Sequence, residues 1–544
     1  MSLRNYLFSI TEPAVLSTSL LEDENIQFDI PQQNSFGDFS TNIALLLAKK
    51  AKTNPRQLAQ KIVDAIKFDE QIISKIEIAG PGFINFFYSS GFIANSILSI
   101  LEAKSNFGKS DKYSGKKANV EFVSANPTGP LTVGHGRNSV FGDTVSSLLE
   151  WVGYSVDREY YFNNAGRQMR VLGDSVRIRY LQLLGSDIEF PADYYQGEYI
   201  TDIAKTLVEE HGDKLKEENA EGLFKDKAEN VIFSDIKETL GRLGIRHKHF
   251  YNENTLYEEG KIKSVLNIFS EKGMSYEKEG ATWLKLAELG NDQDKVIVKS
   301  TGEPTYRLPD IAYHITKFER GYDLIIDIFG SDHKDTYPDV LAALKSLGYN
   351  TEAIKVLLHQ FVTVIKDGEV VKMSTRKANY VTLDELVDEV GVDVTRYFFN
   401  MRSVSSHMNF DLDLAKKQSD DNPVFYLQYA HARICSIIRN AKEAGLESST
   451  DSLITLSTSE EQSLIKKLLL FPDIVLFAAN SFETHKITGY LQELAECFHR
   501  FYTVCRIIGS EQKLAESRLS LALATQIVLQ NGLTLLGLSA PERM

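Results

Sequence analysis

Cysteine is scarce in this sequence, with three residues among 544. Cys435, Cys497 and Cys505 lack the paired spacing of a zinc site, and an odd number does not complete a disulfide framework. We therefore expect a reducing, cytoplasmic location and no bound metal of the protein's own. Proline (13 residues) and glycine (34) are too few for long flexible linkers, which excludes a low-complexity chain.

Long hydrophobic runs are also missing. The N-terminus has no basic stretch followed by an apolar core, so no signal peptide is expected. The segment 519–541 carries no charge, but Ser520, Thr525, Gln526 and Asn531 would make it costly to place in a bilayer. We expect a buried helix there and no membrane partner.

Positive charge is in deficit, since the formal net charge is −14. An acidic chain is not the usual profile of a nucleic-acid-binding protein. More than half of the excess negative charge, however, falls within the segment 181–290. An RNA-binding surface elsewhere on the chain therefore remains compatible with the composition.

Apolar periodicity divides the chain into three parts. Residues 1–112 suggest a small α+β domain, in which a helical stretch at 41–67 is interrupted where Pro55 opens a second helix. A strand, a Gly-Pro-Gly turn and a second strand follow at 76–87. From 421 to 544 helical spacing dominates, which predicts an all-α bundle.

The middle part, 113–420, opens with a β-α-β unit. A strand at 118–124, a helix at 136–151 and a strand at 154–161 predict a parallel sheet. Apolar runs return at the segments 295–299, 324–329 and 356–365. We expect the same sheet to resume there, which would make the acidic segment 181–290 an insertion of helices and a few strands.

The first chemically informative segment links the first strand to the helix. Gly134 and Gly136 flank His135, so a ligand can approach the backbone closely, and a helix N-terminus offers free N–H groups to a phosphate. His135 can also donate a hydrogen bond to a phosphoryl oxygen. The alternative is a tight connection in which His135 only caps the helix.

The second segment runs from Gly368 to Lys377. Lys372, Arg376 and Lys377 place cations just after an apolar Val-Val pair. Cations in a loop can neutralise the charge that accumulates on phosphoryl oxygens in a transition state. The alternative is a solvated basic turn.

Together, these segments resemble the HIGH and KMSK motifs of class I aminoacyl-tRNA synthetases. Longer matches resemble arginyl-tRNA synthetases in particular, and the resemblance covers nearly the whole chain. Two positions depart from the motifs, because Thr132 replaces the first histidine and Thr375 the second lysine. The matching stretches are 35–42, 124–130, 372–380, 421–426, 429–433 and 540–544.

The resemblance implies an α/β, Rossmann-type nucleotide-binding catalytic domain. It implies that the protein activates arginine with Mg-ATP and transfers it to the 2′-hydroxyl of the terminal adenosine of its tRNA. It also implies the following residue roles: catalysis by Thr132, His135, Lys372 and Ser374; ATP binding by Gly134, His135, Gly136, Lys372 and Met373; arginine binding by Glu121, Asn126, Tyr306, Asp310 and His333; and tRNA binding by Tyr429, His431 and Arg433.

The chemistry of arginine supports one of these roles directly. A guanidinium needs a planar carboxylate partner, and Asp310 lies four residues after the aromatic Tyr306. The alternative for Asp310 is a helix N-cap before Ile311. An amino acid with a neutral side chain would leave this carboxylate unpaired, so the pocket would reject it strongly. We therefore expect no separate editing domain.

Two other functions compete with the arginine–tRNA ligase hypothesis. An adenylyl transferase acting on a small molecule would not need the helical C-terminal part. A relative that binds RNA without catalysis is suggested by Thr132 and Thr375, but retention of His135, Lys372, Ser374 and Asp310 argues against it. We expect a monomer.

Overall fold

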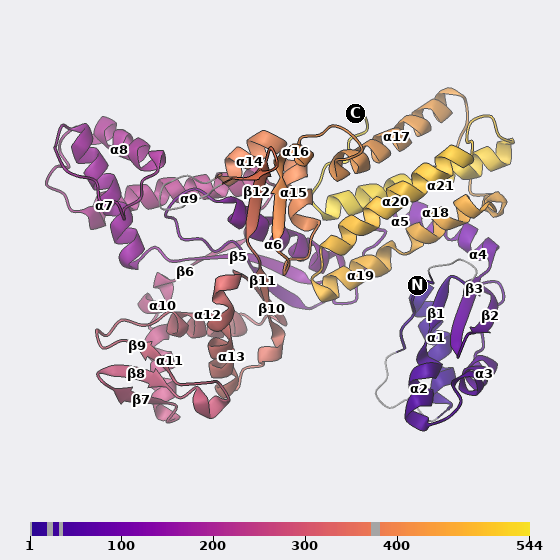
Figure 1. The fold of residues 1–544 in the computed structure, drawn as a ribbon, viewed down its shortest axis with the longest axis horizontal. Helices are drawn as coiled ribbons and strands as arrows, with labels where there is room; N and C mark the ends of the chain where they lie inside the picture. The colour runs from indigo at the N-terminus through magenta and orange to yellow at the C-terminus, as the bar shows by residue number, and fades with distance from the viewer. Residues whose placement is uncertain (1–2, 19–25, 32–35, 372–380) are drawn as a thin grey trace.

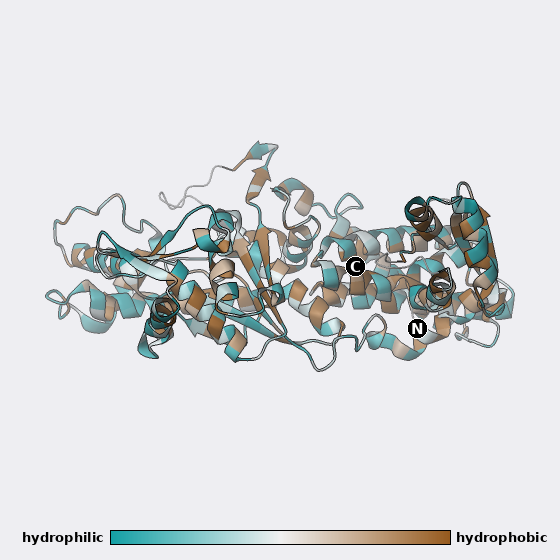
Figure 2. Ribbon diagram, turned by 90° about the horizontal axis from the view of Figure 1, so that it is seen from below, coloured by the Kyte–Doolittle hydropathy of each residue, from teal (hydrophilic) through white to brown (hydrophobic). Residues whose placement is uncertain are grey.

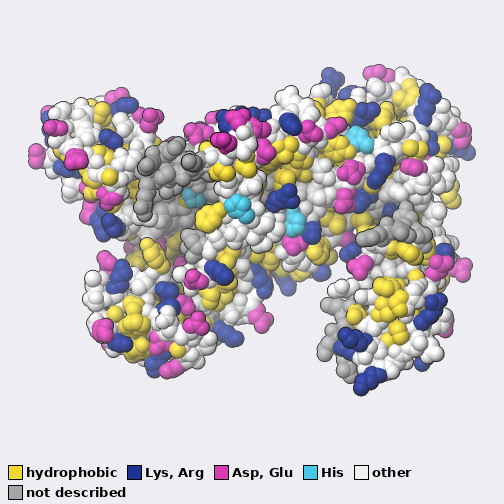
Figure 3. All heavy atoms as spheres, in the orientation of Figure 1, with side chains coloured by type: hydrophobic (Ala, Val, Ile, Leu, Met, Phe, Trp, Pro, Cys, Tyr) yellow, Lys and Arg dark blue, Asp and Glu magenta, His cyan; other side chains and the backbone are white. Residues whose placement is uncertain are grey.

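The computed structural model describes residues 3–18, 26–31, 36–371 and 381–544. Figures 1 and 3 show an elongated body from which two lobes project on the same side. One lobe is the N-terminal part of the chain, and the other carries α10–α13 with β7–β9. A helical arm made of α7 and α8 extends from the left end of the body in Figure 1.

The N-terminal lobe is the α+β unit that the sequence predicts. Its antiparallel sheet has the order β1-β3-β2, and the predicted turn at 80–82 joins β2 to β3. The helical stretch is broken at Asn54, whose side chain accepts hydrogen bonds from the N–H groups of Arg56 and Gln57. The elements of the lobe are α1 (Leu3–Leu16), β1 (Phe39–Thr41), α2 (Ile43–Ala51), α3 (Pro55–Ala65), β2 (Ile73–Ala79) and β3 (Phe83–Tyr88). After them, α4 (Ser90–Asn95) leads back to the body, where α5 (Ile97–Ala103) packs among the C-terminal helices (Figure 1).

A parallel sheet of five strands forms the centre of the body. Its order is β11-β10-β4-β5-β6, and every neighbouring pair is parallel, as the β-α-β unit predicts. The chain starts in the middle and winds outwards in both directions, so β4 and β10 flank the point where the strand order reverses. Ligands of such sheets bind at the carboxyl ends of the strands at this point. The strands are β4 (Lys117–Glu121), β5 (Ser155–Phe162), β6 (His249–Asn252), β10 (Leu324–Gly330) and β11 (Ile354–His359).

Three of the predicted strand assignments need correction. β6 lies inside the acidic segment yet pairs with β5, so that segment is not one uninterrupted insertion. The run at 295–299 does not rejoin the sheet, because β9 (Lys295–Val298) pairs with β8 (Ala281–Leu284) in an antiparallel sheet with β7 (Ser275–Lys278). The run at 356–365 contains two strands. Only β11 belongs to the main sheet, while β12 (Val362–Lys366) pairs with β13 (Glu369–Val370) and β14 (Met408–Asp411).

Helices fill the segments between these strands. The arm contains α7 (Gly166–Leu183) and α8 (Glu198–His211), and α9 (Lys225–Arg242) returns to the body. The lobe below β10 contains α10 (Asn254–Glu258), α11 (Lys261–Glu271), α12 (Arg307–Glu319) and α13 (Tyr337–Ser346). Its apolar side chains form a second core, separate from that of the rest of the chain.

Helix α6 (Val133–Trp151) packs against the sheet, and most of its residues are buried. It begins three residues before the predicted start, so Gly134, His135 and Gly136 lie in its first turn. A glycine is required at position 142, because a Cβ atom there would lie 2.3 Å from the Phe122 ring. This close packing fixes the helix directly over the end of β4.

The C-terminal part is an all-α bundle over its described length, as predicted. Its helices carry hydrophobic and hydrophilic residues around their circumference, as amphipathic helices do (Figure 2). No helix in the described ranges is long and apolar enough to cross a membrane. The helices are α17 (Pro423–Glu443), α18 (Ser459–Leu469), α19 (Phe471–Ser481), α20 (His485–Val504) and α21 (Gln512–Leu535), preceded by α14 (Leu383–Val390), α15 (Val392–Asn400) and α16 (Leu412–Ala415).

A buried arginine joins the bundle to the central sheet. Arg396 on α15 donates to the carboxylate of Asp143 on α6 at 2.7 Å. It also donates to the carbonyl oxygens of Leu243, after α9, and Leu536, after α21. A buried guanidinium is stable only when its donors are satisfied, so these bonds hold α6 in register with both neighbouring parts.

Candidate functional site

The chain leaves β4 in an unusual backbone conformation. Val123 and Ser124 have φ angles of 69° and 44°, a region that non-glycine residues rarely adopt. Asn138 on α6 accepts a hydrogen bond from the Val123 N–H at 2.7 Å and donates to the Ile328 carbonyl of β10 at 3.0 Å. The strained turn is therefore held between β4 and β10, where strained backbone often marks a functional site.

The N-terminus of α6 follows this turn after β4. His135 Nδ1 accepts a hydrogen bond from the Thr132 N–H at 3.1 Å, and Thr132 Oγ1 accepts one from the His135 N–H. The capping role that we considered as the alternative for His135 is therefore present. Because Nδ1 is an acceptor, a neutral imidazole carries its proton on Nε2, where it can donate to a ligand. Burial, with a contribution from His359, lowers the pKa of His135 to about 4, so the ring is neutral at pH 7.

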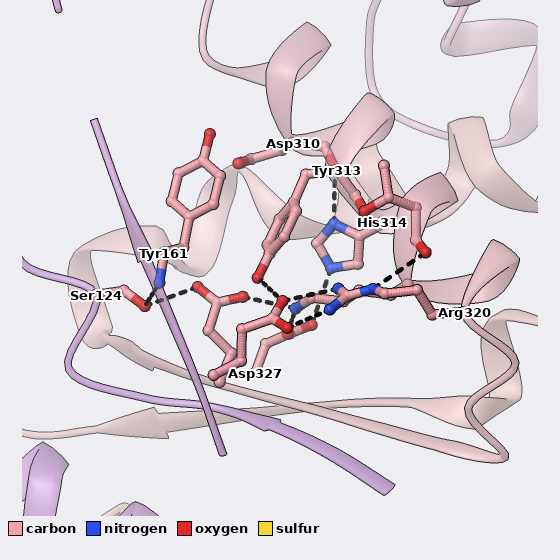
Figure 4. Close-up of polar contacts among 11 residues, drawn as sticks. Ser124, Tyr161, Asp310, Tyr313, His314, Arg320 and Asp327 are labelled. Carbon is pink, nitrogen blue, oxygen red and sulfur yellow. Dashed lines mark hydrogen bonds and ion pairs between the residues drawn. The ribbon is translucent and has the colours of Figure 1, made fainter. Parts of the chain in front are cut away.

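Carboxylates gather on the other side of the turn, and a buried lysine pairs with them (Figure 4). Lys317 on α12 is 0% exposed. Its Nζ lies 2.6 Å from Glu121 Oε2 at the end of β4 and 2.5 Å from Asp327 Oδ1 on β10. The second oxygen of Glu121 accepts a hydrogen bond from Ser124 Oγ at 3.0 Å. Glu121 is therefore fixed in orientation and satisfied within the protein.

His314 completes this cluster as a buried cation. Its Nδ1 lies 2.7 Å from the Asp310 carbonyl oxygen, which can only accept, so Nδ1 must carry a proton. Its Nε2 lies 2.9 Å from Asp327 Oδ2, and Lys317 with His314 holds the pKa of Asp327 well below its usual range. An ionised carboxylate also accepts only, so Nε2 is protonated too. Burial opposes this charge, but Asp327 dominates, and the pKa of His314 is raised.

A second buried carboxylate, Glu159 on β5, has its own partners. Arg320 donates to both of its oxygens, one of them at 2.8 Å, and the Tyr313 hydroxyl donates to it as well. These bonds and the nearby Lys317 outweigh burial and lower the pKa of Glu159. The floor of the site is thus a set of ionised groups whose charges balance.

Asp310 differs from these carboxylates. Among the residues that the structure describes, no side-chain cation or donor binds its carboxyl group, which points away from the cluster in Figure 4. Burial, together with the carboxylates of Glu121 and Glu253, raises the pKa of Asp310 to about 7 despite the opposing effect of His314. It lines a small cavity with His314 and Phe329. It does not take the alternative role of a helix N-cap, since α12 begins at Arg307.

Two further predicted arginine-binding residues lie at the mouth of the site. The amide of Asn126 is oriented by the Asn163 N–H at 3.0 Å and by Gln168 at 2.9 Å. Tyr306 is one helical turn before Asp310, and its side chain is 82% exposed. The structure brings Glu121, Asn126 and Asp310 to one edge of the sheet but leaves Tyr306 in solvent. The side chain of His333 and residues Lys372, Met373, Ser374 and Thr375 lie outside what the structure describes.

The predicted tRNA-binding residues separate into two groups. Tyr429 is on the surface of α17, 36% exposed, stacked on Phe425 at 6.3 Å and bonded to Arg433 at 2.9 Å. His431 is 2% exposed and contacts the Pro541 carbonyl with Nδ1 at 2.9 Å. The prediction for His431 is therefore wrong as to a surface role, because the side chain faces the C-terminal tail inside the bundle.

Three family models match the chain in order. They describe an arginyl tRNA synthetase N terminal domain at residues 5–88, a class I (R) tRNA synthetase catalytic domain at 96–402 and a DALR anticodon binding domain at 427–544. An arginine–tRNA ligase of Pelodictyon phaeoclathratiforme is 50% identical over 552 residues, and one of Chlorobaculum tepidum is 50% identical over 551. Each alignment covers 100% of both chains. The chain belongs to the arginine–tRNA ligase family.

A solved structure supports the fold independently. The arginyl-tRNA synthetase of Thermus thermophilus superimposes with a TM-score of 0.81 at 21% identity, covering 100% of both chains. The resemblance noted in the sequence is thereby confirmed, as is the Rossmann-like catalytic domain between an N-terminal domain and a helical C-terminal domain.

Four residues that build the site of this family member were not predicted from the sequence. Asn138, His314, Lys317 and Asp327 carry the turn and the charged cluster. The available signal was spacing, because Asp310, His314 and Lys317 recur at i, i+4 and i+7 and so share one helix face. Asp327 interrupts an otherwise apolar strand, which is a second signal of a buried partner.

Proposed function

We propose that this arginine–tRNA ligase carries out both steps of its reaction at the edge where β4 and β10 separate. The arginine carboxylate attacks the α-phosphorus of Mg-ATP, and pyrophosphate leaves. The 2′-hydroxyl of the terminal adenosine of the tRNA then attacks the adenylate carbonyl. The supporting observation is that the strand order reverses between β4 and β10, where α6 begins after β4 and where no side-chain cation or donor of the described residues binds the carboxyl group of Asp310.

On the nucleotide side, we assign the phosphates of ATP to the first turn of α6. His135 would donate from Nε2 to a phosphoryl oxygen, and Gly134 and Gly136 would allow close approach to the backbone. Thr132 keeps the imidazole in the required tautomer, so a second histidine at this position is unnecessary for orientation. We propose that Lys372 and Met373 also bind ATP. Lys372 and Ser374 would stabilise the departing pyrophosphate.

On the amino-acid side, Asp310 would receive the guanidinium in a bidentate pair. Tyr306 would turn onto the substrate side chain from its exposed position, one helical turn away. We place the polar end of arginine near Asn126, with Glu121 and His333 completing the pocket. Little covalent work by the protein is required, because positioning and charge stabilisation account for the chemistry.

For tRNA, we propose that Tyr429 and Arg433 on α17 contact RNA by stacking and by pairing with phosphate. We further propose that the ligase is a cytoplasmic monomer, divided near residues 112 and 420. These boundaries were predicted from the sequence and stay predictions.

ATP–pyrophosphate exchange tests the catalytic part of this proposal. The ligase should incorporate labelled pyrophosphate into ATP when arginine is present, and the assay should be run both with and without tRNA. Exchange only with tRNA would show that RNA completes the site. If the folded protein binds tRNA but shows neither pyrophosphate exchange nor charging, the proposal that it is a catalyst is contradicted.

A further inference from the structure

The charges beneath the arginine pocket balance within the protein. Glu121 and Asp327 share Lys317, and Asp327 also pairs with His314. Glu159 pairs with Arg320. Three carboxylates, on β4, β5 and β10, thus face three cations that lie on α12 or directly after it (Figure 4).

We propose that Lys317 is the positioning residue that neutralises Glu121 and Asp327, so that Asp310 alone receives the substrate cation, and that this cation enters the pocket in exchange for a proton. The inference rests on the proposed function, because arginine is taken as the cation. To the proposed function it adds the role of Lys317, which does not touch the substrate, and the release of a proton when arginine binds.

The geometry of Lys317 supports this role. Its stem lies inside the fold and its ammonium group is 4.4 Å from the Tyr313 ring centroid. Without that charge, Asp327 would keep only the His314 imidazolium, and Glu121 would be buried at low dielectric with no cation bound to it among the described residues. Their uncompensated negative charge would then compete with Asp310 for the guanidinium. Lys317, two turns from Asp310 on the same helix face, therefore balances the charge of the carboxylates beneath the pocket.

The surroundings of Asp310 account for the proton. Negative or neutral groups face it from three strands, from the segment after β6 and from α13, while His314 on its own helix is the cation that opposes them. These surroundings raise the pKa of Asp310 to about 7, whereas a carboxylate in a guanidinium pair is ionised. The groups facing Asp310 are Glu121 (β4), Tyr161 (β5), Glu253, Asp327 (β10), Tyr337 (α13) and His314 (α12).

Calorimetry measures the proton directly. Arginine is titrated into the ligase in phosphate and in imidazole, whose ionisation enthalpies differ, at pH 6, 7 and 8. We expect release of about half a proton at pH 7, more at pH 6 and almost none at pH 8. Asp310→Asn should release none at any of the three. Arginine binding by the wild-type chain without proton release at pH 6 would overturn the inference.

Variants of the cluster test the part played by Lys317. Lys317→Met should raise the arginine Kd by about tenfold or more and move the midpoint of its pH dependence upwards, because uncompensated negative charge raises the pKa of Asp310. Lys317→Arg keeps the charge and should restore both. If Lys317→Met does not fold, His314→Gln removes the neighbouring cation and should move the midpoint in the same direction.

The pH midpoint of arginine binding distinguishes a positioning role of Lys317 from a merely structural one. Loss of packing would weaken binding of arginine and ATP alike and would leave the midpoint unchanged, which would contradict the inference. Charging activity separates it from the proposed function. A wild-type ligase that charges tRNA with arginine but shows no proton release refutes only the inference, whereas failure to bind or charge arginine refutes both.

Discussion

Neutralising Asp310 should separate arginine recognition from ATP binding. Asp310→Asn preserves the shape of the side chain and removes its charge. Losing one partner of a hydrogen-bonded charge pair in a binding site costs about 2–5 kcal/mol. At about 1.4 kcal/mol per factor of ten, kcat/KM for arginine should fall between about 30-fold and several thousand-fold. The KM for ATP should stay within about twofold, since α6 and Thr132 are untouched.

Steady-state charging with arginine and ATP varied in turn provides the assay. Glu319→Gln is a matched control, because Glu319 lies on the same helix and, among the described residues, pairs at the surface with Lys261. Such a pair contributes about 0–1 kcal/mol, so this variant should behave as the wild type does. Unchanged kcat/KM for arginine in Asp310→Asn would remove Asp310 from the pocket. An equal loss for ATP would indicate a general structural defect instead.

Three further predictions concern pH, stability and RNA. In the wild type, kcat/KM for arginine should fall about tenfold per pH unit below pH 7, because protonation removes the charge of Asp310, and a pH–rate profile of Asp310→Asn should lack this step. Asn138→Ala leaves the Val123 N–H and Ile328 carbonyl without partners and should lower stability by about 1–3 kcal/mol in denaturant unfolding. Tyr429→Ala should weaken tRNA binding by about 1–3 kcal/mol in filter binding, whereas Tyr257→Ala, another exposed tyrosine, should leave it unchanged.

The fold could be predicted where local patterns suffice. The β4–α6–β5 unit and the bundle follow from apolar periodicity and turn residues. Strand partners could not be predicted in this way, because a four-residue strand such as β6 or β9 has the same pattern in either sheet. Pairing depends on contacts between distant segments, which periodicity does not encode.

The site shows the same limit. Asp310 and His135 were predicted from their chemistry and from the family resemblance, and the structure places both at the sheet edge. The ionisation of His314 was not predictable, because it depends on a carbonyl one turn away and on Asp327 from another element. The exposure of Tyr429 and the burial of His431 likewise depend on how α17 packs against the tail.

The central claim is that this site joins arginine, and no other amino acid, to tRNA. The most direct measurement is charging of the cognate tRNA by the wild-type ligase with each standard amino acid supplied alone with ATP. The account predicts stable charging with arginine only, since Asp310, which no side-chain cation of the described residues binds, rejects a side chain without a cation, and its planar carboxylate disfavours lysine. Charging with a neutral amino acid at a rate comparable to that of arginine would contradict it.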